Sequence, residues 1–242
     1  MCRFKSALVL KDRIFLPDYD SHDKMLQELG IKDNFMNASK VFVRVELFPA
    51  DGNVFSAVDD WEMKVDQDIL PEWWNEAERL PQLKELVETW MQKHTISAGN
   101  REVTGGVWFA TGSATVTATG SATVTAYESA TVRATGSATV TAAGSATVRA
   151  YGSATVRAYG SATVIACESA TVRAYGSATV TATGSATVTA TESATVTACE
   201  SATVIIPQEL ATDGEIELNA NSVCVNHKTH TVKSAIQWKQ EE

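Results

Sequence analysis

Residues 112–207 alternate small apolar residues with hydroxyl-bearing residues, with a period of two. The stretch divides into twelve octads. The first reads Gly-Ser-Ala-Thr-Val-Thr-Ala-Thr from Gly112 to Thr119, and Ser-Ala-Thr-Val is the same in all twelve. In an extended chain, the Ala, Val and Ala at the third, fifth and seventh positions point to one face and the hydroxyls to the other. The pattern therefore predicts one short β-strand per octad, with one buried face.

The alternation has to break where one octad meets the next. Each octad opens with Gly or Glu, and strict alternation would point this residue inward. A carboxylate cannot be buried without a partner, so the first position is predicted to lie at a corner. The four octads that open with Glu begin at Glu128, Glu168, Glu192 and Glu200. A single strand cannot bury its own face, so the octads are expected to coil and stack as a solenoid.

Two coil sizes fit this repeat. Two octads per coil give a two-sided solenoid of 16-residue coils, and three give a triangular prism of 24-residue coils. The two-sided form is favoured, because Val then faces Val at the centre while the smaller Ala residues lie towards the narrow corners. Six such coils would stack to about 29 Å. The core is thin, so parallel backbone ladders are expected to supply much of the order.

The regions on either side of the repeats have a different pattern. We predict a small α+β capping domain over residues 1–103, the solenoid over 104–207 and a C-terminal β cap over 208–242. Caps are expected because an open solenoid end exposes unpaired strand edges. The C-terminal cap is placed on residues 215–232, where Glu-Ile-Glu-Leu and Val-Cys-Val are separated by polar turns.

Several elements are predicted within the N-terminal domain. Strands are expected over residues 3–10 and 13–16 as a hairpin, and over 40–48 and 61–65. Helices are expected from Ser21 to Leu29, with Gly30 ending the helix, and from the first turns marked by Pro71 and Pro81. The helix at Pro81 should run to His94 and bury Leu83, Leu86, Val87, Trp90 and Met91. The domain core is expected to include Trp61, Trp73, Trp74 and Trp90.

The chain is acidic, with a formal net charge of −9, but the charge is not uniform. The octads hold four Arg and four Glu, while residues 1–103 hold 13 basic and 19 acidic residues. This balance argues against nucleic-acid and anionic-membrane partners. The longest apolar run of the N-terminal region, residues 7–10, is too short to span a bilayer and ends too early, at Lys11, for a signal peptide. The four scattered cysteines form no disulfide framework, so a reduced, cytoplasmic protein is expected, with secretion by a route without a cleaved signal as the alternative.

The sixth and eighth positions of each octad point outward and vary. Arg and Tyr gather there between residues 127 and 175, and both are enriched at binding hot spots. The alternative is a solvated surface on which Arg side chains stack over Tyr rings. Thr-x-Thr-x-Thr runs at both ends of the array resemble insect ice-binding solenoids, but the Arg and Tyr residues interrupt them. The candidate binding residues are Tyr127, Arg149, Tyr151, Arg157, Tyr159, Arg173 and Tyr175.

Catalytic chemistry has one candidate, at the start of the chain. Removal of Met1 would leave Cys2 with a free α-amine, and Met1 to Phe4 resembles the start of the N-terminal-nucleophile glutamine amidotransferases, where that Cys attacks an amide. His22, near Asp20 and Asp23, is a possible partner. The chain departs from that class because no Gly follows Cys2 and no Asn-Gly motif is present. Cys224, His227 and His230 are metal-type residues, but Cys224 and His227 would point to opposite faces of a strand, so no metal or cofactor is expected.

Three stretches and the octads together resemble an uncharacterised family of gut Firmicutes and their phages. The stretches are Met1 to Leu10, Asp20 to Ile31 and Phe42 to Leu47. The resemblance implies a phage or mobile-element context and no known activity. We therefore predict a non-enzymatic β-solenoid that has a structural role or binds a protein partner, or that self-associates. The alternatives are an N-terminal-Cys amide hydrolase and an ice-binding protein.

Overall fold

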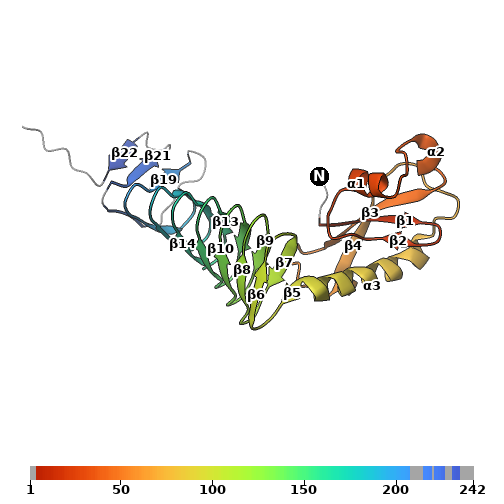
Figure 1. Cartoon of the computed structure of the whole chain (residues 1–242), viewed down its shortest axis with the longest axis horizontal. Coiled ribbons are helices and arrows are strands. Elements are labelled where there is room, and N and C mark those ends of the chain that lie inside the picture. The colour runs from red at the N-terminus through yellow and green to blue at the C-terminus, as the bar shows by residue number, and fades with distance from the viewer. Residues whose placement is uncertain (1–3, 208–214, 220, 227–230, 235–242) are drawn as a thin grey trace, which may run out of the picture. The chain divides into compact units, whose positions relative to one another are not determined.

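The computed structural model describes residues 4–207, 215–219, 221–226 and 231–234. The chain divides into two compact units, Met1–His94 and Thr95–Glu242 (Figure 1). Residues 95–103, which the sequence pattern places with the N-terminal domain, form strands that pair with the solenoid. The solenoid therefore begins before the first regular octad.

The N-terminal unit is built on a four-stranded antiparallel sheet in the order β2-β1-β3-β4. The hairpin and both later strands predicted from the sequence are confirmed. The strands are β1 (Lys5–Leu10), β2 (Ile14–Phe15), β3 (Phe42–Pro49) and β4 (Trp61–Val65). Every residue of β1 is buried, and so is every residue of β3 except Arg44 and Phe48, so both faces of the sheet are covered.

Helices cover the two faces of this sheet (Figure 1). They are α1 (His22–Glu28), α2 (Phe35–Ala38), α3 (Glu76–His94) and the short 3₁₀ helix η1 (Val58–Asp60). The α1 helix begins as predicted, because the Ser21 side chain accepts the Lys24 N–H, and it ends before Gly30 at φ 66°. Met25 and Leu26 of α1 pack on Leu8, Leu10 and Phe42 of the sheet.

The predicted helix starts at the prolines are wrong. α3 begins at Glu76, after Asn75 accepts the Glu78 N–H, and Pro81 lies inside the helix, where it cannot donate to the carbonyl of residue 77. No helix begins at Pro71, which lies in a turn. Leu86 is 39% exposed instead of buried, whereas the other four apolar residues named for this face are buried. Trp61 and Trp90 are buried as expected, and Trp73 and Trp74 are only partly buried.

The solenoid is two-sided with 16-residue coils, as favoured from the sequence, and the triangular alternative is wrong. Successive octads alternate between two parallel sheets, and each strand pairs with the strand two octads away, so that Val132 lies beside Val148 and Val156 beside Val172. We call the sheets C and B. Sheet C contains β6 (Asn100–Val103), β8 (Thr115–Ala118), β10 (Thr131–Ala134), β12 (Thr147–Ala150), β14 (Thr163–Ala166), β16 (Thr179–Ala182), β18 (Thr195–Ala198) and β20 (Ile216–Leu218).

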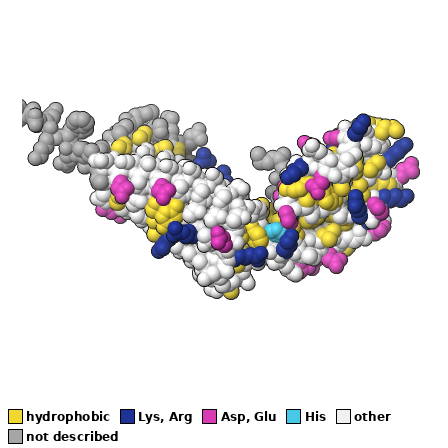
Figure 2. Space-filling model, viewed as in Figure 1, with side chains coloured by type: hydrophobic (Ala, Val, Ile, Leu, Met, Phe, Trp, Pro, Cys, Tyr) yellow, Lys and Arg dark blue, Asp and Glu magenta, His cyan; other side chains and the backbone are white. Residues whose placement is uncertain are grey.

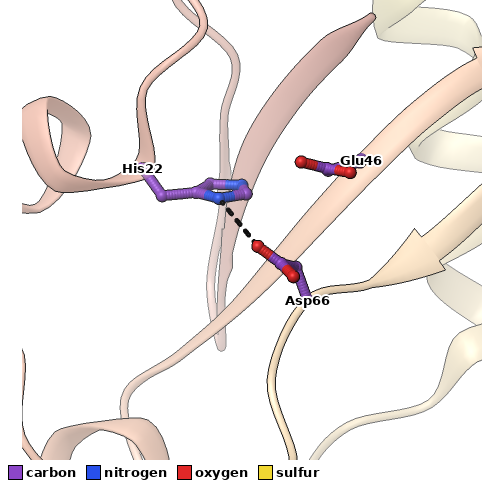
Figure 3. A group of neighbouring side chains, drawn as sticks. All are labelled: His22, Glu46 and Asp66. Carbon is purple, nitrogen blue, oxygen red and sulfur yellow. Dashed lines mark ion pairs between the residues drawn. The ribbon is translucent and has the colours of Figure 1, made fainter. Parts of the chain in front are cut away.

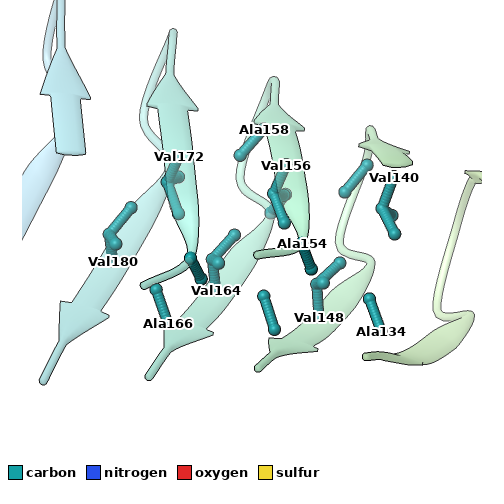
Figure 4. Packing of buried hydrophobic residues seen from close by; sticks show 14 of the residues in the cluster. Ala134, Val140, Val148, Ala154, Val156, Ala158, Val164, Ala166, Val172 and Val180 are labelled. Atoms are coloured by element: carbon teal, nitrogen blue, oxygen red, sulfur yellow. The ribbon is translucent and has the colours of Figure 1, made fainter. Parts of the chain in front are cut away.

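Sheet B faces sheet C across a core of valine and alanine. It contains β5 (Thr95–Ile96), β7 (Val107–Ala110), β9 (Thr123–Ala126), β11 (Thr139–Ala142), β13 (Thr155–Ala158), β15 (Thr171–Ala174), β17 (Thr187–Ala190), β19 (Thr203–Ile206), β21 (Val223–Asn226) and β22 (Thr231–Ser234). The third, fifth and seventh positions of the octads are buried throughout (Figure 4). The inside and outside assignment made from the sequence is confirmed.

The two ends of the solenoid depart from the valine pattern. In the first coil, Arg101 and Trp108 lie in register with Val116 and Val124, and the Arg101 guanidinium lies 4.4 Å from the centre of the Trp108 ring. At the other end, β20 and β21 extend both sheets in parallel, and β22 then pairs antiparallel with β21. The parallel ladder of sheet B therefore ends in a reversed strand.

The first residue of every octad lies at a corner in the left-handed region, as the predicted break in alternation requires. The octad glycines have φ between 58° and 66°, and the four glutamates have φ between 54° and 59°. Each glutamate follows a Gly one coil earlier and accepts the N–H of that Gly through Oε2 at 2.7–2.9 Å. A Cβ added at Gly184 would lie 2.9 Å from the Glu168 backbone nitrogen. A side chain at the corner one coil after a Glu would therefore be crowded.

The buried valine row predicts a strong effect of a charge at its centre. Val156→Asp places a carboxylate between two sheets that offer no partner, and we expect the free energy of unfolding to fall by more than about 4 kcal/mol, with several coils lost. Thr155→Asp puts the same charge on the outward position beside it and should change stability by about 1 kcal/mol or less. Far-UV circular dichroism during urea unfolding measures both, and equal effects would contradict the assignment.

The glutamate corners predict a difference between two small substitutions. Glu168→Ala removes the acceptor for the Gly152 N–H and keeps a side chain in the left-handed region, so it should destabilise the solenoid by about 1–2 kcal/mol. Glu168→Gly loses the same hydrogen bond but relieves the backbone, and should be about 1 kcal/mol more stable than the Ala variant. Thermal unfolding of the full chain compares the two, and an Ala variant as stable as the Gly variant would contradict this account.

Candidate functional site

The Arg and Tyr residues of the octads do not form one patch, because the two-sided fold divides them. Arg133 and Arg149 are neighbours on sheet C, and Arg157 and Arg173 are neighbours on sheet B. The eighth position follows each strand into a corner, so Tyr151 lies at the corner after sheet C. Tyr127, Tyr159 and Tyr175 follow strands of sheet B. Residues that are close in sequence therefore lie on opposite sides of the solenoid.

Four of these residues are brought together on sheet B, and we call them the Arg157–Tyr175 strip: Arg157, Tyr159, Arg173 and Tyr175. The rings of Tyr159 and Tyr175 stack with centroids 4.9 Å apart and planes 7° from parallel. Tyr159 is 39% exposed and both arginines are exposed. Within the described parts of the chain, neither guanidinium forms an ion pair. Aromatic area and unpaired positive charge thus share one rigid surface.

On sheet C, one arginine and one tyrosine of the octads contact each other. The Arg133 guanidinium lies 4.6 Å from the centre of the Tyr151 ring, one coil further on. This is the Arg–Tyr stacking that the alternative interpretation of the sequence predicted. Arg149 lies between Arg133 and Ile165 on the outer face. Tyr127 shares its corner with the strip but is separated from Tyr159 by the coil that carries Ala143.

Threonine rows on the outer faces are short. Threonine occupies both outward strand positions in at most two successive rungs of either sheet, namely β16 and β18 on sheet C and β9 and β11 on sheet B. β8 on sheet C and β17 on sheet B are single rungs of the same kind, and Arg or Ile takes the sixth position in the remaining octads of both sheets. Figure 2 shows the visible face of the solenoid as mostly uncharged polar surface with a few charged side chains.

Of the candidate catalytic pair, Cys2 and His22, the structure describes only His22. Cys2 lies outside the described residues. His22 is buried at the start of α1 with its ring beside Glu46 and Asp66 (Figure 3), and Asp20 and Asp23 line the same hollow. Its Nε2 lies 3.2 Å from the Val45 carbonyl oxygen and its Nδ1 lies 3.7 Å from Asp66 Oδ2. The sequence spacing could not predict that these residues lie together, because they come from α1, β3 and the end of β4.

A buried lysine positions the segment that leads into α1. Lys5 is fully buried, and its ammonium donates to the Pro17 carbonyl at 2.6 Å and to Asp20 Oδ1 at 3.1 Å. It also lies 4.5 Å from the centre of the Trp90 ring. Burial lowers the pKa of Lys5, and the charge of Asp20 opposes that shift. The burial of Lys5 could not be predicted from the sequence, because an isolated Lys in an alternating strand is ordinarily exposed.

The C-terminal metal-type residues are not assembled in the described part of the chain. Cys224 points into the solenoid core at 5% exposure, and burial raises the pKa of its thiol. His227 and His230 lie outside the described residues. Cys167 and Cys199 are free thiols at the same corner, with the coil of Thr183 between them.

Comparison of the chain with family models, with curated proteins and with solved structures gives no match. Among the described residues, no helix has the length and apolar character to span a membrane. A function therefore has to be inferred from the residues of this chain and their geometry.

The role of Lys5 predicts a large effect of removing its charge. Lys5→Met leaves Asp20 without a cation and two carbonyls without a donor, and we expect the N-terminal unit to lose about 2–3 kcal/mol of stability. Lys11→Met removes an exposed charge from the same hairpin and should have almost no effect. Tryptophan fluorescence during urea unfolding follows this unit, and matching midpoints for the two variants would refute the proposed role.

Proposed function

We propose that the protein is a protein-interaction module whose solenoid presents the Arg157–Tyr175 strip to an acidic surface of a protein partner. The observation that carries this proposal is the exposed Tyr159–Tyr175 stack beside two neighbouring arginines that lack ion pairs among the described residues. The division of the Arg and Tyr residues between the two sheets supports the proposal, because it places this tyrosine stack and these two arginines on the same sheet.

The strip has the physical properties of a preformed binding site. Tyrosine rings that are already stacked lose little side-chain entropy on binding and offer amphipathic contact area. The two guanidiniums are held on neighbouring rungs, so their like charges repel in the free protein. A partner carboxylate placed between them would relieve that repulsion and accept charge-assisted hydrogen bonds. The strand backbone holds these groups in place, so binding requires little rearrangement.

The expected partner is acidic, and the chain itself contains acidic surface. Residues 1–103 hold six more acidic than basic residues, so a second copy of the chain is one source of such a surface and would give the self-association predicted from the sequence. A different protein is the other source. The two differ in the mass of the particle that the purified protein forms.

The other predicted functions have less support. Amide hydrolysis by Cys2 stays a prediction, because that residue is not described and His22 has other neighbours. Ice binding requires long flat threonine rows, and the rows on both faces are interrupted. A cytoplasmic location and a phage or mobile-element origin also remain predictions.

The strip predicts loss of binding in a double variant. Purified Tyr159→Ala/Tyr175→Ala protein, used as bait in host lysate, should capture the partner at least ten-fold less than the wild type, because the aromatic area is gone. Arg157→Ala/Arg173→Ala should lose capture to a similar extent, and wild-type capture should weaken as salt is raised. Light scattering of the purified wild type measures the mass of the particle, which shows whether the partner is a second copy of the chain or a different protein.

The matched control is Tyr151→Ala, which removes the same residue type from the same octad position at the opposite corner. Thermal unfolding must first verify that all variants keep the fold. Equal capture by the wild type, the control and both strip variants would overturn the proposal. Capture lost equally in the control and the strip variants would also overturn it, since the effect would not be specific to sheet B.

A further inference from the structure

We propose that His22, Glu46 and Asp66 form a binding site for one divalent transition-metal ion, such as zinc. The three residues come from the start of α1, the middle of β3 and the residue after β4. One ligand atom from each lies within 4.8 Å of the other two (Figure 3). This site lies in the N-terminal unit and is independent of the strip on the solenoid.

The hydrogen bond of His22 aims a lone pair at the two carboxylates. A carbonyl oxygen can only accept, so the contact of 3.2 Å between Nε2 and the Val45 carbonyl places the ring proton on Nε2. In the neutral ring, Nδ1 then carries the lone pair, and it faces Asp66 Oδ2 at 3.7 Å. Metal-binding histidines commonly donate their other N–H to a backbone carbonyl in this way, which fixes the ring orientation.

Glu46 provides a second, independent observation. It is 4% exposed, and among the described residues its carboxylate forms neither a hydrogen bond nor an ion pair. The buried hydroxyl of Ser6, which pairs with Glu46 across β1 and β3, also has no hydrogen-bond partner. A buried carboxylate without a partner is costly. A cation between Glu46, His22 and Asp66 would remove that cost.

The spacing suits an ion of zinc's size. Tetrahedral ligand atoms bound at about 2.0–2.2 Å lie about 3.4 Å from one another, and Nδ1 and Asp66 Oδ2 are already 3.7 Å apart. Asp66 is 46% exposed, so its side chain can adjust. The site opens on a hollow of about 570 Å³ that Asp66 and His22 help to line, which leaves room for water to complete the coordination shell.

The charges around the hollow favour a cation. Its arginine, Arg44, is paired with Asp33 at 2.6 Å, and Asp20 is paired with Lys5. Lys64 lies 4.0 Å from Asp66 on the side of Oδ1, and Asp23 adds a further carboxylate to the lining. One imidazole nitrogen with two carboxylate oxygens suits zinc, manganese or iron, whereas calcium prefers six to eight oxygens.

Isothermal titration of the chelator-treated full chain with zinc chloride tests the site. We expect one ion per chain with a micromolar or tighter dissociation constant, and binding weakened at least ten-fold in Glu46→Gln and Asp66→Asn. Asp23→Asn, which removes a carboxylate from the same hollow but not from the cluster, is the matched control and should bind as the wild type does. Zinc should also raise the melting temperature of the wild type and not that of Asp66→Asn.

A nuclear magnetic resonance measurement distinguishes this site from a simple ion pair. Zinc should shift the His22 ring signals, and manganese should broaden them, with the chain otherwise folded. If His22 is only an imidazolium paired with Asp66, zinc will leave its signals unchanged and Asp66→Asn will bind zinc as tightly as the wild type. Either result overturns the proposal. Asp66 is partly exposed, so its variant keeps the test valid even if Glu46→Gln does not fold.

Discussion

The structure of the solenoid depends on one constraint, the hydrogen-bonded ladder that joins each strand to the strand 16 residues later. The core alone is thin, since alanine and valine bury little area. Each rung therefore depends on backbone bonds such as Thr147 N–H to Ala130 O and Tyr151 N–H to Ala134 O, both 2.9 Å. These bonds form in every coil only if no residue is inserted or deleted. The strict length of the octad follows from that requirement.

The same ladder determines the corners. Because the coils stack directly, the first residue of each octad lies against the first residue of the octad one coil earlier. The backbone N–H of the next residue, a Ser, donates to the carbonyl of that earlier residue, as Ser153 does to Gly136. A left-handed backbone in such close contact favours Gly. Glutamate is accepted where its carboxylate reaches back to the N–H of a Gly one coil earlier, as Glu168 does to Gly152. Crowding and hydrogen bonding at the corner thus select Gly or Glu for the first position of each octad.

The ladder also explains how much of the fold could be predicted. An inside row of Ala and Val follows directly from a period of two, and the pairing of Val132 with Val148 follows from octads that alternate between two sheets. That Arg149 and Arg157 lie on different sheets follows only once the coil size is known. The sequence favoured 16-residue coils but left 24-residue coils open. The stack of Tyr159 on Tyr175 follows only once both are known to share a corner. In the N-terminal unit, Pro81 misled the prediction, because the cap at Asn75 begins the helix earlier.

The pattern of hydrophobic and polar residues could not predict a site that depends on contacts between residues far apart in the sequence. Lys5, Glu46 and Asp66 each occupy a strand or a strand end with no unusual spacing, and their burial and partners are set by how α1 and the segment before it fold onto the sheet. Lys5 holds Pro17 and Asp20 against β1, and α1 starts two residues after Asp20, so His22 is delivered to the sheet face that carries Glu46. The cation that we propose beside Glu46 would offset the cost of burying a carboxylate at that point. The chemistry of the His22 cluster therefore depends directly on the fold of the N-terminal unit. In the solenoid, by contrast, the repeated core leaves the outer positions free to vary.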